Sequence, residues 1–150
     1  MPKGQIRDII NALGVALAGK PELLVEVKEK IDKIYENKLR GEDRLAAYGE
    51  IAALIDFPSE YRHARYLADN IRDITDIAER FIAQKAFAEE ANVEEFLGLS
   101  ISRYCGVDGW IKGTVSKIHV NGYFTFRPDD KSIRATSVDP RYRNKFSLKM

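Results

Sequence analysis

The spacing of apolar residues changes once along the chain, and this change constrains the fold more than any other feature. Before Cys105, apolar residues recur every three or four positions, which is the period of a helix that buries one face. Two glycines in Cys105–Gly109 then indicate a loop, and β-branched and aromatic residues dominate from Trp110 onward. The pattern predicts an α+β chain, with an all-helical bundle in residues 1–104 and a small antiparallel β module in residues 105–150.

The helical part is expected to contain about five helices, one of them long. The segment Glu60–Ala91 has neither glycine nor proline and carries one apolar stripe, which predicts a single continuous helix. Asn92–Glu95 has the residues of a capping box, in which Glu95 reaches back to the Asn92 amide. This box predicts that a last short helix follows and includes Ile101 and Tyr104. No strand is expected before Gly109.

In the β part, Asn121–Gly122 is a strong signal for a two-residue hairpin turn with positive φ at both positions. Such a turn would pair Lys117 with Phe126 and His119 with Phe124, and would place these four residues on one face of the sheet. Two interpretations of that face stay open. Either the rings stack on unpaired bases while the cations bind phosphates, or the rings are the core of a sheet of three or four strands.

Charge is distributed unevenly along the chain. Residues 1–104 contain 15 Lys and Arg against 19 Asp and Glu, whereas residues 105–150 contain 9 against 4. A basic segment after an acidic body predicts an anionic partner, which is either a nucleic acid or the acidic surface of the same or a neighbouring chain. The candidate phosphate contacts are Lys112, Lys117, Arg127, Lys131, Arg134, Arg141, Arg143 and Lys145.

The sequence lacks the common catalytic motifs. It contains no P-loop, no glycine pattern for dinucleotides and no Gly-x-Ser-x-Gly. The two histidines, His63 and His119, lie in different parts of the chain, and a single cysteine excludes an intramolecular disulfide. We therefore expect a non-catalytic protein without metal or cofactor. No apolar stretch reaches the roughly 18 residues of a membrane span, and no signal-peptide pattern is present, so a cytoplasmic protein without a membrane partner is predicted.

Residues 112–130 resemble the first half of a cold-shock domain, a small barrel of the OB type. Lys112–Val115 and Gly122–Asp130 match the Lys-Gly-x-Val and Gly-Tyr/Phe-Gly-Phe strands of that family and its Pro-Asp-Asp turn. Phe124 stands in place of the second glycine of the family's pattern. The resemblance implies an incomplete barrel with a base-stacking face.

The plan of the whole chain, a helical bundle of about a hundred residues with a β appendage, resembles the small subunit of archaeal CRISPR Cascade-type effector complexes. Those subunits are non-catalytic and line the complex in repeated copies beside the nucleic acid. The leading hypothesis is a protein that binds single-stranded RNA or DNA as a small subunit of a larger ribonucleoprotein or antiviral effector complex. Other subunits, or copies of itself, would be its partners. The rival hypothesis is a scaffolding module whose basic β tail docks on an acidic protein surface.

Overall fold

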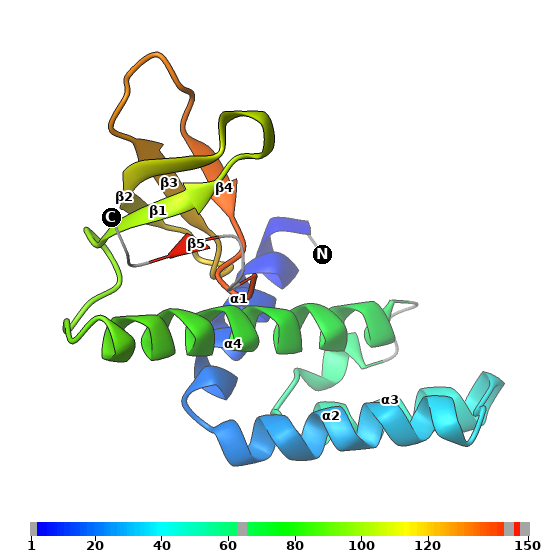
Figure 1. The fold of residues 1–150 in the computed structure, drawn as a ribbon. Helices are drawn as coiled ribbons and strands as arrows, with labels where there is room; N and C mark the ends of the chain where they lie inside the picture. The colour runs from blue at the N-terminus through cyan, green and yellow to red at the C-terminus, as the bar shows by residue number, and fades with distance from the viewer. Residues whose placement is uncertain (1–2, 63–65, 143–145, 148–150) are drawn as a thin grey trace. The chain divides into compact units, whose positions relative to one another are not determined.

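The computed structural model describes residues 3–62, 66–142 and 146–147 (Figure 1). In these ranges, four α-helices precede a five-stranded antiparallel sheet, which confirms the α+β class. The chain divides into two compact units, Met1–Ala78 and Glu79–Met150. Helix α4 (Leu67–Glu90) contributes residues to both. None of the helices in the described ranges is both long enough and apolar enough to cross a membrane.

The first unit contains α1 (Lys3–Ala18), α2 (Pro21–Glu36), α3 (Gly41–Leu54), the short 3-10 helix η1 (Ser59–Tyr61) and the first half of α4. The helices approach closely at Gly14, where an added Cβ would lie 2.3 Å from Cγ2 of Ile77, so only glycine fits there. The apolar stripes of the helices form the core, which includes Ile10, Leu17, Leu24, Val27, Ile31, Ile34, Tyr48, Ile51, Ile71 and Ile74.

The long helix is shorter than the predicted span Glu60–Ala91, because its first residues form a separate turn. Tyr61 donates its amide hydrogen to the carbonyl of Pro58 over 3.1 Å, a spacing typical of a 3-10 turn. The Tyr61 ring packs edge-on against Phe57, and Nε of Arg62 donates to the Phe57 carbonyl over 2.9 Å. These contacts favour the compact turn, and α4 starts only at Leu67.

Three helices end on a residue other than glycine in the left-handed region. Lys38 follows α2, Asp56 follows α3 and Asn92 follows α4, with φ between 53° and 58°. After α4, the amide of Val93 donates to the Ala88 carbonyl over 2.9 Å, the bond that defines a Schellman end. The predicted capping box at Asn92–Glu95 is therefore wrong: Asn92 ends one helix and does not begin another.

The second unit, here called the β unit, combines the end of α4 with the sheet, whose strand order is β4-β3-β2-β1-β5. The elements are β1 (Ser100–Tyr104), the 3-10 turn η2 (Gly106–Asp108), β2 (Trp110–Ile118), β3 (Phe124–Pro128), β4 (Thr136–Val138) and β5 (Phe146–Ser147). The predicted fifth helix is thus wrong, because β1 occupies its place. All five residues of β1 pair with β2, and this pairing overrides the local spacing of apolar residues.

The inner face of the sheet forms a core with the end of α4. Phe96 contacts both Phe87 of α4 and Phe124 of β3, with ring centroids 5.9 and 4.9 Å apart. Arg103 of β1 donates a hydrogen bond to the hydroxyl of Thr136 in β4, although these strands are not neighbours in the sheet. The sheet must therefore curl until its first and fourth strands meet, in the manner of a partly closed barrel.

The hairpin between β2 and β3 has a longer turn than the sequence predicts. Gly122 has φ 88°, as expected, but Asn121 is not in the positive-φ region. The carbonyl of His119 accepts from Gly122, and its amide donates to the Tyr123 carbonyl. These bonds define a three-residue loop, Val120 to Gly122, with glycine at the left-handed position. Ile118 therefore pairs with Phe124, and the register shifts again between Val115 and Lys117.

Candidate nucleic-acid interface

The outer face of the sheet carries the exposed basic and aromatic side chains of β1, β2 and β3. Strand β2 alternates, with Ile111, Gly113 and Val115 buried and with Trp110 and Lys112 exposed. We define the outer face by the side chains opposite the core, which are Tyr104, Trp110, Lys112, Thr114, Lys117, Thr125 and Arg127. No Asp or Glu occupies an outward position in these three strands, so the face is basic.

Two aromatic rings lie exposed at one end of the outer face. Tyr104 pairs with Trp110 across β1 and β2, and their ring centroids are 5.7 Å apart. The residues are 42% and 53% exposed, so a flat ligand can reach both rings. Neither ring was predicted to lie at the site, because the apolar spacing placed Tyr104 in a helix and left Trp110 without a partner ring. The alternation of Trp110, Lys112 and Thr114 in β2 could have located Trp110, whereas Tyr104 follows only from its pairing with Trp110.

Phe124 and Phe126 are core residues, not a stacking platform. Both are fully buried on the inner face, opposite Ile118 and Val115. The longer turn explains the difference: a register shift of one residue moves Lys117 and His119 to the other face of the sheet from the rings. The interpretation in which these rings form the small sheet's core is confirmed, and the one in which they stack on bases is wrong.

The eight predicted cations divide into four groups. Lys112, Lys117 and Arg127 are exposed on the outer face, and Lys131 and Arg134 are exposed in the connection between β3 and β4. Arg141, in contrast, is half-buried and holds the carboxylate of Asp139 through Nε and Nη2. Arg143 and Lys145 lie outside the described residues. The outer face thus gathers three of the eight predicted cations.

His119 lies on the same side of the hairpin as Lys117, beside a hollow. Its Nε2 is 2.8 Å from Oγ1 of Thr125, so the ring is held by a hydrogen bond. The hollow has a volume of about 710 Å³ and is lined by Lys117, His119, Thr125 and Ser137, among others. From Trp110 to Lys117, β2 spans about 23 Å at about 3.3 Å per residue. The face is therefore long enough for several nucleotides.

Arg80 of α4 fixes the hairpin beside this face. Its guanidinium lies 4.1 Å from the Tyr123 ring centroid and donates to the Asn121 carbonyl, while Gln84 donates to the Gly122 carbonyl over 2.6 Å. Asp139, with a 5% exposed side chain, lies 3.6 Å from Nε of Arg80. Burial opposes ionisation of Asp139, but hydrogen bonds from Arg141 and the nearby positive charges outweigh it, so the pKa of Asp139 is lowered.

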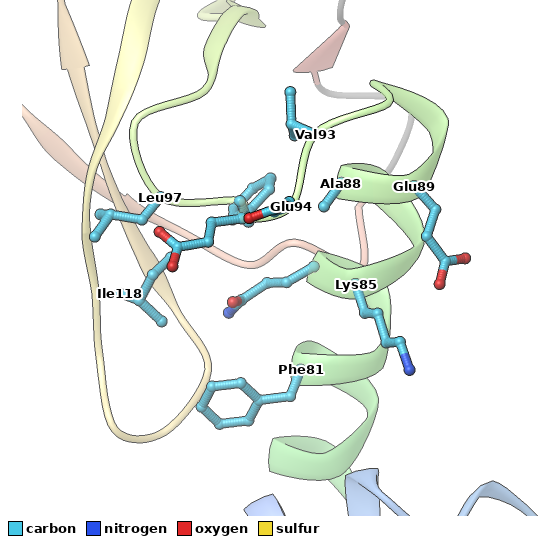
Figure 2. Close-up of a pocket in the computed structure, with 11 residues that line it drawn as sticks. Phe81, Lys85, Ala88, Glu89, Val93, Glu94, Leu97 and Ile118 are labelled. Atoms are coloured by element: carbon cyan, nitrogen blue, oxygen red, sulfur yellow. The ribbon is translucent and has the colours of Figure 1, made fainter.

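A second surface feature of this unit is an apolar groove with acidic neighbours (Figure 2). Phe81, Lys85, Ala88 and Glu89 line it from α4, while Leu97 and Ile118 lie across the groove. Its volume is about 470 Å³, and Val93 and Leu97 are 41% and 49% exposed. Three carboxylates, on Glu89, Glu94 and Glu95, line it against one ammonium. This charge would repel phosphate, so the groove does not extend the basic outer face.

The described part of the chain contains no cluster of three or more His, Cys, Asp or Glu side chains that could hold a metal ion. Comparison of the chain with protein-family models, with curated proteins and with solved structures finds no match.

Proposed function

We propose that the outer face of the sheet binds single-stranded RNA or DNA without catalysis. The observation that supports this most is the combination of the exposed Tyr104–Trp110 pair with Lys112, Lys117 and Arg127 on one face. Single-strand binders use this combination, because aromatic rings stack on bases of any sequence while cations follow the phosphates. The hydroxyl of Thr114 adds a hydrogen-bond donor between Lys112 and Lys117.

The proposed setting is a larger assembly. The helices of the first unit would contact other subunits, and the sheet of the second unit would contact the nucleic acid. A small subunit of a cytoplasmic ribonucleoprotein or antiviral effector complex, as the resemblance in plan implies, is the form of this proposal that the sequence favours.

The proposal predicts that single-stranded affinity depends steeply on salt through three side chains. We expect the triple variant Lys112→Gln, Lys117→Gln, Arg127→Gln to reduce the slope of log K against log salt by about 2, since each phosphate contact contributes about 0.7. Fluorescence anisotropy of a labelled oligonucleotide between about 50 and 200 mM salt measures this slope.

Trp110→Ala should weaken binding about tenfold without changing the slope, because it removes stacking only.

The matched control removes the same charge from the other unit. Lys20, Lys33 and Arg40 are exposed on or beside α2, and changing all three to Gln should leave the slope within error of the wild type. Equal losses of slope in both triple variants would mean that binding follows net charge alone. Failure of the wild type to bind at the lowest salt would refute the proposed function of the outer face.

The acidic groove supports a second candidate, in which copies of the chain associate. Its carboxylates complement the basic β part of another copy, and its exposed Leu97 and Val93 supply apolar area. We expect Leu97→Arg to convert an assembly to monomers, measured by sedimentation equilibrium. Val107→Arg is the control, because Val107 is fully exposed and does not line the groove. A wild type that is monomeric at high protein concentration rules out this candidate.

A further inference from the structure

A cleft opens at the end of the curled sheet where two connections leave it. The connection between β1 and β2 and that between β3 and β4 lie at the same end of the strands (Figure 1). The cleft has a volume of about 640 Å³, within the range of small-molecule sites. Its lining includes Arg103, Tyr104 and Cys105 at the end of β1 and Ile133 and Arg134 from the connection between β3 and β4.

The lining combines two guanidinium groups with an apolar wall. Arg103 comes from the inner side of β1 and is held by its hydrogen bond to Thr136. Its Nε is buried and has no hydrogen-bond partner among the described residues. Arg134 is exposed, and Pro128 and Ile133 provide apolar surface between the connections. Two arginines beside an apolar wall match a ligand that has a phosphate at one end and a flat ring at the other.

The cleft is continuous with the outer face through one residue. Tyr104 lines the cleft, and its ring also contacts Trp110 on the outer face. A single-stranded nucleic acid with one base stacked on Trp110 would therefore have its next nucleotide beside the cleft. The single carboxylate in the lining, on Asp108, is an acceptor for a ribose hydroxyl or a base amino group.

We propose that this cleft holds one nucleotide. Its phosphate binds Arg134 and Arg103, and its base packs against Tyr104 and the apolar wall formed by Pro128 and Ile133. The proposal deepens the proposed function and rests on it, since the nucleotide is the end of the strand bound by the outer face. It names the ligand class as a nucleoside monophosphate unit. Tight binding requires both the base and the phosphate, because the apolar wall recognises only the base and the guanidinium groups recognise only the phosphate.

Cys105 gives a direct reporter for the cleft. It is the only cysteine of the chain, lines the cleft and is half-buried. The probes are 5′-AMP and 5′-UMP, with adenosine and inorganic phosphate as fragments, all at one ionic strength. We expect each mononucleotide to slow alkylation of Cys105 by iodoacetamide in a saturable manner. The concentration for half protection by either fragment should be at least about tenfold higher, the factor for one lost charge-assisted contact.

Two variants test which side chains bind the phosphate. Arg134→Gln should raise the half-protection concentration about tenfold, and because Arg134 is exposed its loss leaves the fold intact. Arg103→Gln should do the same, with circular dichroism as the check on folding. Lys33→Gln, on α2 and outside the cleft lining, is the control and should protect like the wild type. No protection of the wild type by millimolar mononucleotide, equal protection by phosphate alone, or an unchanged Arg134→Gln would each overturn the proposal.

The same samples separate this inference from the proposed function. Trp110→Ala should lose oligonucleotide affinity while its Cys105 stays protected by 5′-AMP, because that ring does not line the cleft. Oligonucleotide binding without mononucleotide protection therefore refutes the cleft proposal alone. Mononucleotide protection without oligonucleotide binding refutes the proposed function and, with it, the assignment of the cleft to a strand end.

Discussion

Gly113→Ala should destabilise the β unit by about 3 kcal/mol, since overpacking of a tight interior costs 1–3 kcal/mol and backbone atoms here cannot move aside. A Cβ at this position would lie 2.5 Å from the carbonyl oxygen of Arg127 and 2.6 Å from two ring atoms of Phe126. Strand β2 is the third of five strands, so it is held on both sides by β1 and β3. The glycine therefore allows the Phe126 ring to cross directly over the strand.

Trp110 makes this measurement selective. It is the only tryptophan of the chain and lies in β2, so its fluorescence during urea denaturation reports the β unit. Gly49→Ala is the matched control, because nothing lies within 4 Å of its Cβ position and alanine stabilises a helix by about 1 kcal/mol relative to glycine. Circular dichroism follows that variant. A Gly113→Ala protein as stable as the wild type would show that β2 and β3 separate easily.

The helices were predictable because one physical rule decides them. Leu24, Val27, Ile31 and Ile34 recur at helical spacing in the sequence, and all four are buried in α2. The rule fails where pairing between distant strands decides the structure. Residues 100–104 fit a helical spacing as well as an alternating one, and only the partner strand β2 selects between them. A five-residue segment carries too little periodicity to make that choice.

The candidate site was harder to predict than the fold, because a face assignment depends on register. The sequence correctly placed Lys112 and Lys117 in a strand, but it paired Lys117 with Phe126 instead of Thr125. One extra loop residue moves Lys117 to the face opposite the Phe124 and Phe126 rings, and a bulge then shifts the register a second time, so that Val115 lies opposite Phe126 on the inner face. Tyr104 and Trp110 follow from the same register, so no property of either residue alone identifies the aromatic pair.

Asp139→Asn should lower the stability of the β unit by about 3 kcal/mol at neutral pH, the cost of removing one partner from a buried ion pair. The carboxylate is 2.8 Å from Nη2 of Arg141 and 3.6 Å from Nε of Arg80, whose side chain is only 12% exposed. An amide at this position leaves the Arg80 charge buried without its counter-charge. Since Arg80 also positions the hairpin through Asn121 and Tyr123, the loss affects the outer face as well.

The pH dependence of this effect has a definite sign. The pKa of Asp139 is lower in the folded protein than in the unfolded chain, because hydrogen bonds and charges of the arginines outweigh its burial. The carboxylate therefore stabilises the fold above the pKa of an unfolded aspartate, which is about 4. That contribution is lost as the pH falls through the lower folded value. The difference in unfolding free energy between wild type and Asp139→Asn should thus be full at pH 7 and shrink progressively below about pH 4.

Asp129→Asn provides the control for charge itself. Asp129 is exposed directly after β3, and no ion pair of its carboxylate is seen in the described part of the chain. Its variant should change the unfolding free energy far less than Asp139→Asn at neutral pH. Urea denaturation followed by Trp110 fluorescence at several pH values compares the two. A difference for Asp139→Asn that stays constant from pH 7 down to pH 2 would mean that shape, and not ionisation, makes Asp139 stabilising.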